Sequence, residues 1–445
     1  MDQNYLLPNA IAKELYFSTA ADLPLIDYHN HLSVKDLAED RQYSDIAEAW
    51  LLNDPYKHRA MRICSVDEAL ITGNAPRKEK FAAWCSVYPR LIGNPLYDWS
   101  ALEIKKLFGI ETPICRENAE KLWDEANEKL QEKAFHARGI YHHFNIRYAA
   151  PCATIGEDLT PFSSVAGLAP SLRGDDLLTL SAGFIDSLSA AAGIPITDFD
   201  SLKQAVTIRL EEFQKANCRF SDHAIDNGFT YRRDDGKNPD RIASILAGST
   251  PGPADREHIA SAMLRFLADQ YAARGWTMQL HIGAQRSTST RLRRVAGPAG
   301  GFAAIGSPVS VLTLTEMLDD FEQNDAGLPH IILFTLNPAD NAVFAVLSGS
   351  FPGVTQGPAW WWCDHLHGMR EMLESFSSYS ILSTFVGMTT DSRSLLSLLR
   401  HDYFRRMLCG WIGEKADAGE FPREPAALKN LVTELCYSNA EKLIH

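Results

Sequence analysis

Residues 24–32 of this chain read Pro24-Leu25-Ile26-Asp27-Tyr28-His29-Asn30-His31-Leu32. The segment after Pro24 is short and mostly apolar, which predicts a buried β-strand over 25–28 rather than a helix. Side chains two residues apart on a strand point to the same face, so we expect His29 and His31 to lie side by side. Two imidazoles in this arrangement at the end of a strand can hold one divalent metal ion.

The composition is that of a soluble globular protein. The 445 residues include 45% hydrophobic and 22% charged side chains, enough to bury a large core. The formal charge of −13 argues against nucleic-acid and anionic-membrane partners, because both need a basic face. An anionic small substrate stays compatible with this charge, since a few local arginines are enough to bind it.

Cysteine spacing, the N-terminal sequence and the length of the apolar runs indicate the cell compartment. The eight cysteines are scattered and form no CxxC pair, which is typical of reduced thiols in the cytoplasm. The sequence does not begin with a signal-peptide pattern, and no apolar run reaches the roughly 20 residues of a membrane span. We therefore expect a soluble cytoplasmic protein, with a homo-oligomer as one form that the sequence leaves open.

Apolar residues at three- and four-residue spacing predict helices from about residue 34 to 137. Turn signals interrupt them at Asn53-Asp54-Pro55, Gly73-Asn74-Ala75-Pro76 and Gly93-Asn94-Pro95. A hundred residues is too long for one crossover between strands, so we predict an inserted helical subdomain. The predicted organisation has three parts: 1–33 with an N-terminal helix and the first strand, 34–138 with the helical subdomain, and 139–445 with the remaining barrel and C-terminal helices.

Strand signals alternate with helical ones beyond Gly139. The strand candidates are 145–151, 164–170, 219–223, 277–282, 330–336, 353–356 and 385–390. With the first strand they make eight, and the alternation predicts a parallel sheet closed as a distorted (β/α)8 barrel of the α/β class. A doubly wound open sheet is the structural alternative, but no GxGxxG follows any strand, so a dinucleotide-binding fold gains no support.

Polar residues gather where the predicted strands end, and the active site of such a barrel lies at those ends. His29 and His31 follow the first strand, Asp222 and His223 the fourth, and His281 the fifth. Further polar residues occupy 337–341 and 390–393. First and last strands are neighbours in a closed barrel, so His29, His31 and Asp391 can converge on one ion with an open position for water or substrate.

Each of these residues also has a simpler structural interpretation. An HxH pair arises by chance, and Asp391 in front of a helix is an ordinary N-cap. A lone histidine such as His281 is more often a hydrogen-bonded core residue than a ligand. The Trp360-Trp361-Trp362 run is core, the edge of a lid or a sugar-stacking platform. The joint placement of polar residues at several strand ends favours the metal site, because packing alone does not require it.

The chain resembles the uronate isomerases (glucuronate isomerases) of the amidohydrolase superfamily, nearly from end to end. The segments that carry the resemblance are Asp27-Tyr28-His29-Asn30-His31-Leu32, Tyr56-Lys57-His58-Arg59-Ala60-Met61-Arg62, Ile92-Gly93-Asn94-Pro95-Leu96-Tyr97, Ser221-Asp222-His223-Ala224, His281-Ile282-Gly283-Ala284, Leu336-Asn337-Pro338-Ala339-Asp340-Asn341, Phe385-Val386-Gly387-Met388-Thr389-Thr390-Asp391-Ser392-Arg393-Ser394 and Arg400-His401-Asp402-Tyr403-Phe404-Arg405-Arg406.

The resemblance implies a cytoplasmic enzyme of hexuronate breakdown that interconverts D-glucuronate with D-fructuronate and D-galacturonate with D-tagaturonate. It implies one divalent ion, which we expect to be zinc, on His29, His31 and Asp391. The family's active-site tyrosine falls on Tyr56 and its arginines on Arg173 and Arg393.

Roles follow from the chemistry of moving a proton from C2 to C1 of the sugar. We predict that Asp391, Tyr56 and Arg393 act in catalysis, Asp391 and Tyr56 in proton transfer. Fork-shaped guanidinium groups match a substrate carboxylate. The residues predicted to contact the substrate are Arg173, Arg393, His281, Tyr56 and Trp361.

Three departures from the family pattern are expected to lie where the substrate sits. Pro55 stands where the family usually has His, residues 153–158 lack the usual Thr-Thr-Asp-Asp-Pro run, and residues 358–364 are altered. They keep two alternatives open: a metal-dependent hydrolase of a sugar-acid derivative such as a lactone, and a non-catalytic sugar-acid binder.

Overall fold

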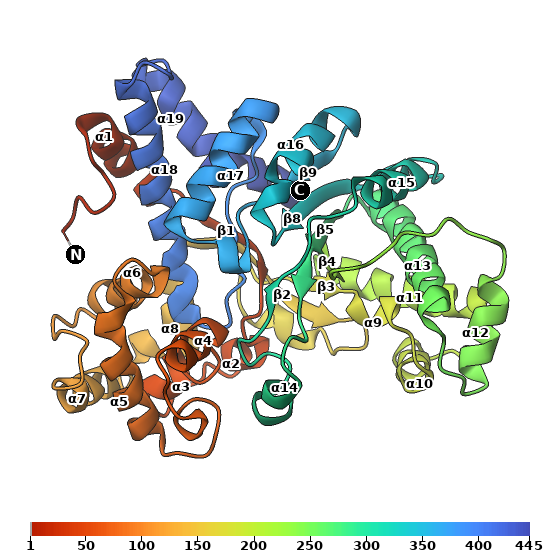
Figure 1. Ribbon diagram of the computed structural model, residues 1–445, viewed down its shortest axis with the longest axis horizontal. Helices are drawn as coiled ribbons and strands as arrows, with labels where there is room; N and C mark the ends of the chain where they lie inside the picture. The colour runs from red at the N-terminus through yellow and green to blue at the C-terminus, as the bar shows by residue number, and fades with distance from the viewer. Residues whose placement is uncertain (1) are drawn as a thin grey trace.

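The computed structural model describes residues 2–445, and its sheet begins with the strand that carries the histidine pair (Figure 1). Within these residues seven parallel strands form one curled sheet in the order β1-β2-β3-β4-β5-β8-β9. Their bounds are β1 Leu25–Asn30, β2 Ile146–Thr154, β3 Ser171–Arg173, β4 Phe220–Ile225, β5 Thr277–Ile282, β8 His330–Thr335 and β9 Val354–Gln356. The predicted α/β fold with a parallel sheet is confirmed.

The third strand was predicted at 164–170, and this is wrong. Gly167 has φ +79°, and a Cβ there would lie 2.9 Å from the carbonyl oxygen of Arg147, so this segment turns instead of extending. It keeps a single bridge between Ala149 and Leu168. The strand itself follows as β3, whose last residue is Arg173.

The eighth strand, predicted at 385–390, is not a regular strand. Gly387 has φ +79° and packs against the backbone of Leu435, where a Cβ would lie 2.5 Å from the carbonyl oxygen. The segment still runs beside β1, joined by Tyr28 Oη to the carbonyl of Gly387 (3.0 Å) and by Asp391 N to the carbonyl of His29 (3.1 Å). The barrel is therefore closed by single hydrogen bonds at this position, and its distortion lies here.

Two apolar layers hold the sheet in shape. Inside the curl, Ile26, Tyr28, Phe220, Phe334 and Val386 form a buried cluster. Outside it, the helices between and after the strands pack into a larger buried cluster. These helices are α9 Asp175–Leu178, α10 Ala182–Ala192, α11 Phe199–Lys215, α12 Asn238–Leu246, α13 Pro253–Arg274, α15 Val311–Glu322, α16 Asn341–Ser350, α17 Leu366–Tyr379, α18 Arg400–Asp417 and α19 Pro425–Thr433, with α1 Ala10–Ser18 before β1. The short helix α20 Asn439–Glu441 contributes Ala440 to the inner cluster instead.

The region between β1 and β2 is helical, as predicted. Its helices are α2 Val34–Ala38, α3 Ile46–Trp50, α4 Pro55–Ile63, α5 Arg77–Val87, α6 Pro95–Leu102, α7 Ala119–Lys129 and α8 Ala137–His143, drawn mostly in orange in Figure 1. Asp54 caps α4 and Pro55 is its first residue, which explains the break at this point. The division of the chain at 33 and 138 stays a prediction. None of the helices in residues 2–445 combines the length and apolar character that crossing a bilayer requires.

A short arm, not predicted from the sequence, leaves the sheet after β5. We define it as residues 284–305: β6 Ala284–Gln285 and β7 Ala304–Ile305 pair antiparallel, and α14 Thr290–Ala296 lies between them.

Two histidines make the stability of this fold sensitive to acid. Burial lowers the pKa of His223 and of His330 to about 4. An unfolded histidine titrates near 6.5, so the unfolded chain takes up protons first. Above pH 6.5 these histidines are neutral in both states and do not lower the free energy of unfolding. As the pH falls from 6.5 to 4, the unfolded chain binds protons that the folded chain does not, so the free energy of unfolding decreases.

We expect His330 to contribute about 2 kcal/mol to the loss of stability between pH 7.5 and 4.5. Urea unfolding at both pH values measures it. His330→Gln, which cannot take up the proton, loses about 2 kcal/mol less than the wild type between them. An equal loss in the two proteins would contradict this assignment.

Candidate active site

The histidine pair lies at the carboxyl end of β1, and Asp391 lies between the two rings. The Asp391 Oδ1 atom is 3.3 Å from His29 Nε2 and 3.1 Å from His31 Nε2. Asp391 adopts φ +49°, a left-handed conformation that Asp tolerates better than most residues. Two backbone hydrogen bonds hold it there: Asp391 N donates to the carbonyl of His29 (3.1 Å), and His31 N donates to the carbonyl of Ser392 (2.7 Å).

Asp391 is ionised at neutral pH. Burial acts to raise its pKa, but the hydrogen bonds and charges of His29 and His31 outweigh burial and hold the pKa well below the usual range. Its other oxygen, Oδ2, accepts a hydrogen bond from Trp360 Nε1 at 3.1 Å. The carboxylate is thus fixed from three sides.

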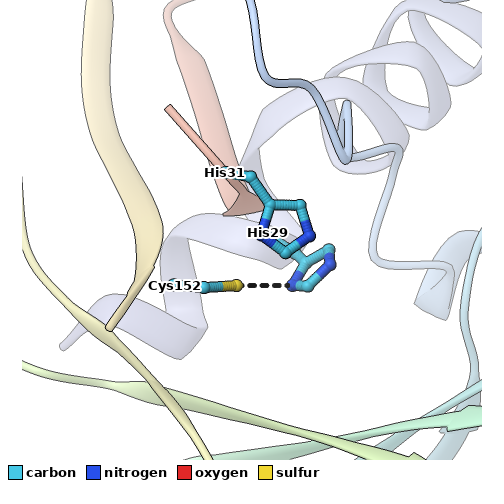
Figure 2. Close-up of side chains that lie close together, drawn as sticks. All are labelled: His29, His31 and Cys152. Atoms are coloured by element: carbon cyan, nitrogen blue, oxygen red, sulfur yellow. Dashed lines mark hydrogen bonds between the residues drawn. The ribbon is translucent and has the colours of Figure 1, made fainter. Parts of the chain in front are cut away.

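Cys152 of β2 lies beside the histidine pair, as Figure 2 shows. Its Sγ lies 3.7 Å from His29 Nδ1 and 3.2 Å from Asp222 Oδ1. In two sets of side chains, one potential metal-binding atom from each member lies within 4.8 Å of the others: His29 with His31 and Cys152, and His29 with Asp222 and His281. Asp391 stands outside both sets but touches both histidines. Imidazole, carboxylate and thiol donors of this kind suit a divalent transition metal.

Tyr56 of α4 is held by two charged residues from the far end of the chain. Its hydroxyl donates to Asp364 Oδ2 at 3.2 Å, and Asp364 in turn pairs with Arg400, whose guanidinium lies 5.5 Å from the Tyr56 ring. Burial, and next the charge of Asp364, raise the pKa of Tyr56 well above its usual value. Tyr56 is therefore a neutral phenol that can donate a hydrogen bond. Burial also raises the pKa of Asp364 to about 7.

The two predicted arginines differ in their surroundings. Arg173 is paired through Nη2 to Asp175 Oδ2 (2.7 Å) and through Nη1 to Asp222 Oδ2 (3.3 Å). Arg393 is exposed, and the described residues offer it no ion pair. Arg173 is thus largely neutralised by the protein, whereas Arg393 keeps its charge available.

One cavity of about 1080 Å³ brings the predicted residues together. It is lined by all of His29, His31, Tyr56, Arg173, His281, Trp361, Asp391 and Arg393. His223, predicted to follow the fourth strand, lies inside β4 and bonds to Tyr271 Oη at 3.1 Å. It is not among the lining residues.

Residues 153–158, which differ from the family pattern, were expected to lie where the substrate binds, and this prediction is also wrong. Pro55 and Trp361 line the cavity, but none of the described residues 153–158 does. Arg209 of α11 donates to the carbonyls of Ile155 (2.8 Å) and Glu157 (2.7 Å) and holds this loop away from the cavity.

A family model described as glucuronate isomerase matches residues 1–444 of the chain. The chain belongs to the glucuronate isomerase family. The uronate isomerase of Salmonella paratyphi A is 41% identical to it, with 99% of this chain and 98% of that protein covered. This confirms the predicted family and the prediction of an isomerase enzyme.

Solved structures agree with this assignment. The uronate isomerase of Thermotoga maritima has a TM-score of 0.94 at 27% identity, covering 100% of this chain and 99% of that one. The glucuronate isomerase of Caulobacter crescentus has a TM-score of 0.93 at 22% identity, covering 100% and 96%, and so shows the fold. A protein of Lactobacillus casei ATCC 334 assigned to the metal-dependent hydrolases shares the fold more loosely, with a TM-score of 0.55 at 14% identity over 96% of both chains.

Several residues that contact the candidate site are not evident from sequence spacing. Cys152 lies 123 residues from His29, and Asp364 lies 308 residues from Tyr56 and pairs with Arg400. Cys152 is the one that strand position could have indicated, because it lies near the carboxyl end of β2, the strand next to β1.

Proposed function

We propose that this isomerase interconverts D-glucuronate with D-fructuronate and D-galacturonate with D-tagaturonate. The observation that carries the proposal is the single cavity lined by all eight predicted site residues in a chain of the glucuronate isomerase family. A cavity of about 1080 Å³ has ample room for an open-chain hexuronate.

We propose one divalent ion, zinc, held by His29, His31 and Asp391. The fit rests on the residues present: both Nε2 atoms are within 3.3 Å of one carboxylate oxygen, and Cys152 adds a soft donor beside His29. When bound, such an ion polarises an oxygen of the substrate.

The chain's own residues divide the remaining work. Tyr56 is a neutral phenol with a single hydroxyl proton, which it exchanges from Asp364 to the substrate oxygen on which charge develops as the proton leaves C2. Asp391 is ionised and is available as a proton acceptor, although its low pKa makes it a weak one. Arg393 presents its exposed guanidinium to the anionic substrate.

The cell compartment and assembly are part of the same proposal. Free cysteines throughout the described chain suit a reducing cytoplasm. We propose cytoplasmic hexuronate breakdown as the setting, with a homo-oligomer as one assembly to be checked by light scattering.

We expect the purified protein to form ketose from glucuronate and galacturonate, to lose this activity on chelation and to regain it with Zn²⁺. Product formation is followed by chromatography, beside metal analysis of each sample. Absence of ketose under metal-replete conditions would contradict the proposal. Oxygen-18 uptake from water into an acyl product of a lactone would instead favour the hydrolase alternative.

A further inference from the structure

The arm at residues 284–305 forms one side of the cavity. It packs tightly on α4: at Gly301, with φ +78°, a Cβ would lie 2.3 Å from the carbonyl oxygen of Pro55. The side chain of Arg62 also bonds to the carbonyl of Gly300. These contacts fix the arm against the helix that carries Tyr56, so side chains at its base have defined positions along the cavity.

Arg286, directly after β6, is held in place at the base of this arm. Its Nε donates to Asp226 Oδ1 at 2.7 Å, and its guanidinium carbon lies 5.6 Å from the ring of Trp361. The hydrogen bond to Asp226 sets the direction of the guanidinium, and the Trp361 ring packs near it. Its two terminal nitrogens have no acceptor among residues 2–445, and the side chain lines the cavity.

Trp361 is itself held in an unfavourable backbone conformation. Its φ of +52° lies in the left-handed region, which bulky side chains rarely adopt. The conformation places its half-buried indole on the cavity wall beside Arg286. Strain of this kind persists where the surrounding structure enforces it, and it clusters at ligand-binding positions.

Five arginines line the cavity: Arg173, Arg286, Arg293, Arg393 and Arg400. Arg293 is exposed and bonds to Ser287 Oγ through Nη1 at 2.6 Å. Arg173 is matched by Asp175 and Asp222, and Arg400 is buried against Asp364. Arg286 is also ion-paired, to Asp226, but through Nε alone, so both terminal nitrogens remain as an end-on fork. Such a fork matches the two oxygens of a carboxylate.

We propose that Arg286 binds the carboxylate of the substrate through its terminal nitrogens, with Asp226 and Trp361 as its positioning residues. The proposal rests on the proposed function for the identity of the substrate, an open-chain uronate. It adds Arg286, on a segment that the sequence pattern does not mark, to the arginines predicted from the sequence.

The test compares D-glucuronate with D-glucuronamide, which has the same skeleton without the negative charge. Binding to the metal-loaded protein is measured by calorimetry, and turnover of glucuronate is measured separately. Variants are Arg286→Met, Arg286→Lys and, as a matched control, Arg294→Met, an exposed arginine of α14 that does not line the cavity. Circular dichroism checks that each variant is folded.

We expect the wild type to bind glucuronate more tightly than glucuronamide. Arg286→Met weakens glucuronate binding about tenfold or more and glucuronamide binding by less than about threefold. Arg286→Lys, which keeps the charge but not the fork, falls between, and Arg294→Met behaves as the wild type.

Equal effects of Arg286→Met on both ligands, an unchanged preference, or a wild type without any preference for the carboxylate would each overturn the assignment. Should Arg286→Met not fold, Arg286→Lys alone decides, since its preference must fall below that of the wild type. A wild type that binds with the expected preference but makes no ketose refutes the proposed function and leaves the role of Arg286 standing.

Discussion

Replacing Asp391 with Asn lowers kcat/KM for glucuronate by about 10²–10⁴-fold. The amide has nearly the shape of the carboxylate, but it carries no charge between His29 and His31 and accepts no proton. It also weakens the proposed metal site, so the metal content of the purified variant falls. Steady-state kinetics and elemental analysis measure the two effects on the same sample.

Asp186→Asn is the matched control, because Asp186 is exposed on α10 and distant in sequence from the site. It keeps the activity and metal content of the wild type. An Asp391→Asn protein with wild-type turnover and full metal would show that the carboxylate serves neither purpose.

The second large effect concerns stability. We expect Asp27→Ala to lose about 3–5 kcal/mol of unfolding free energy. Asp27 is fully buried, and its carboxylate accepts from Thr389 Oγ1 (2.9 Å), Thr390 N (2.7 Å), Thr390 Oγ1 (2.8 Å) and Asn30 Nδ2 (3.0 Å). His401 Nε2 lies 3.2 Å from Asp27 Oδ1. Alanine leaves Thr390 N and Thr390 Oγ1 buried without this acceptor, whereas Thr389 Oγ1 keeps the carbonyl of His29 (2.6 Å) and Asn30 Nδ2 keeps the backbone carbonyl of residue 27 (3.1 Å).

Urea unfolding at pH 7.5 measures the loss for Asp27→Ala. Asp22→Ala removes an exposed carboxylate just before β1 and changes the unfolding free energy by no more than about 0.5 kcal/mol. A similarly small change in Asp27→Ala would mean that the buried hydrogen bonds around Thr389 and Thr390 do not stabilise the fold.

What the sequence predicts well is local. The apolar run at 25–28 and the HxH spacing place the histidine pair correctly, and Asp54-Pro55 marks the start of α4. The third strand is misplaced and the eighth segment is not a regular strand because Gly167 and Gly387 turn the backbone, and each glycine is required by a close approach to another backbone segment. No pattern along the chain records such an approach.

The partners of the site residues are harder to predict for the same reason. Asp364 and Arg400 meet Tyr56 across more than 300 residues, and Arg286 stands on an arm whose two strands have two residues each. Strands this short carry no periodicity. The family resemblance predicts Tyr56, Arg173 and Arg393, whereas the position of Arg286 depends on the packing of the arm against α4.

Between β1 and residues 385–391 the barrel is closed by hydroxyls and one carboxylate more than by a backbone ladder. A ladder depends on every peptide group along it and tolerates little change in register. Hydrogen bonds made by side chains depend on single residues, here Thr389, Thr390 and above all Asp27, and a change at one of the threonines leaves the seven-stranded ladder intact. The position of the loop that carries Asp391, next to the histidines, is therefore set by a few side chains and not by a continuous backbone ladder.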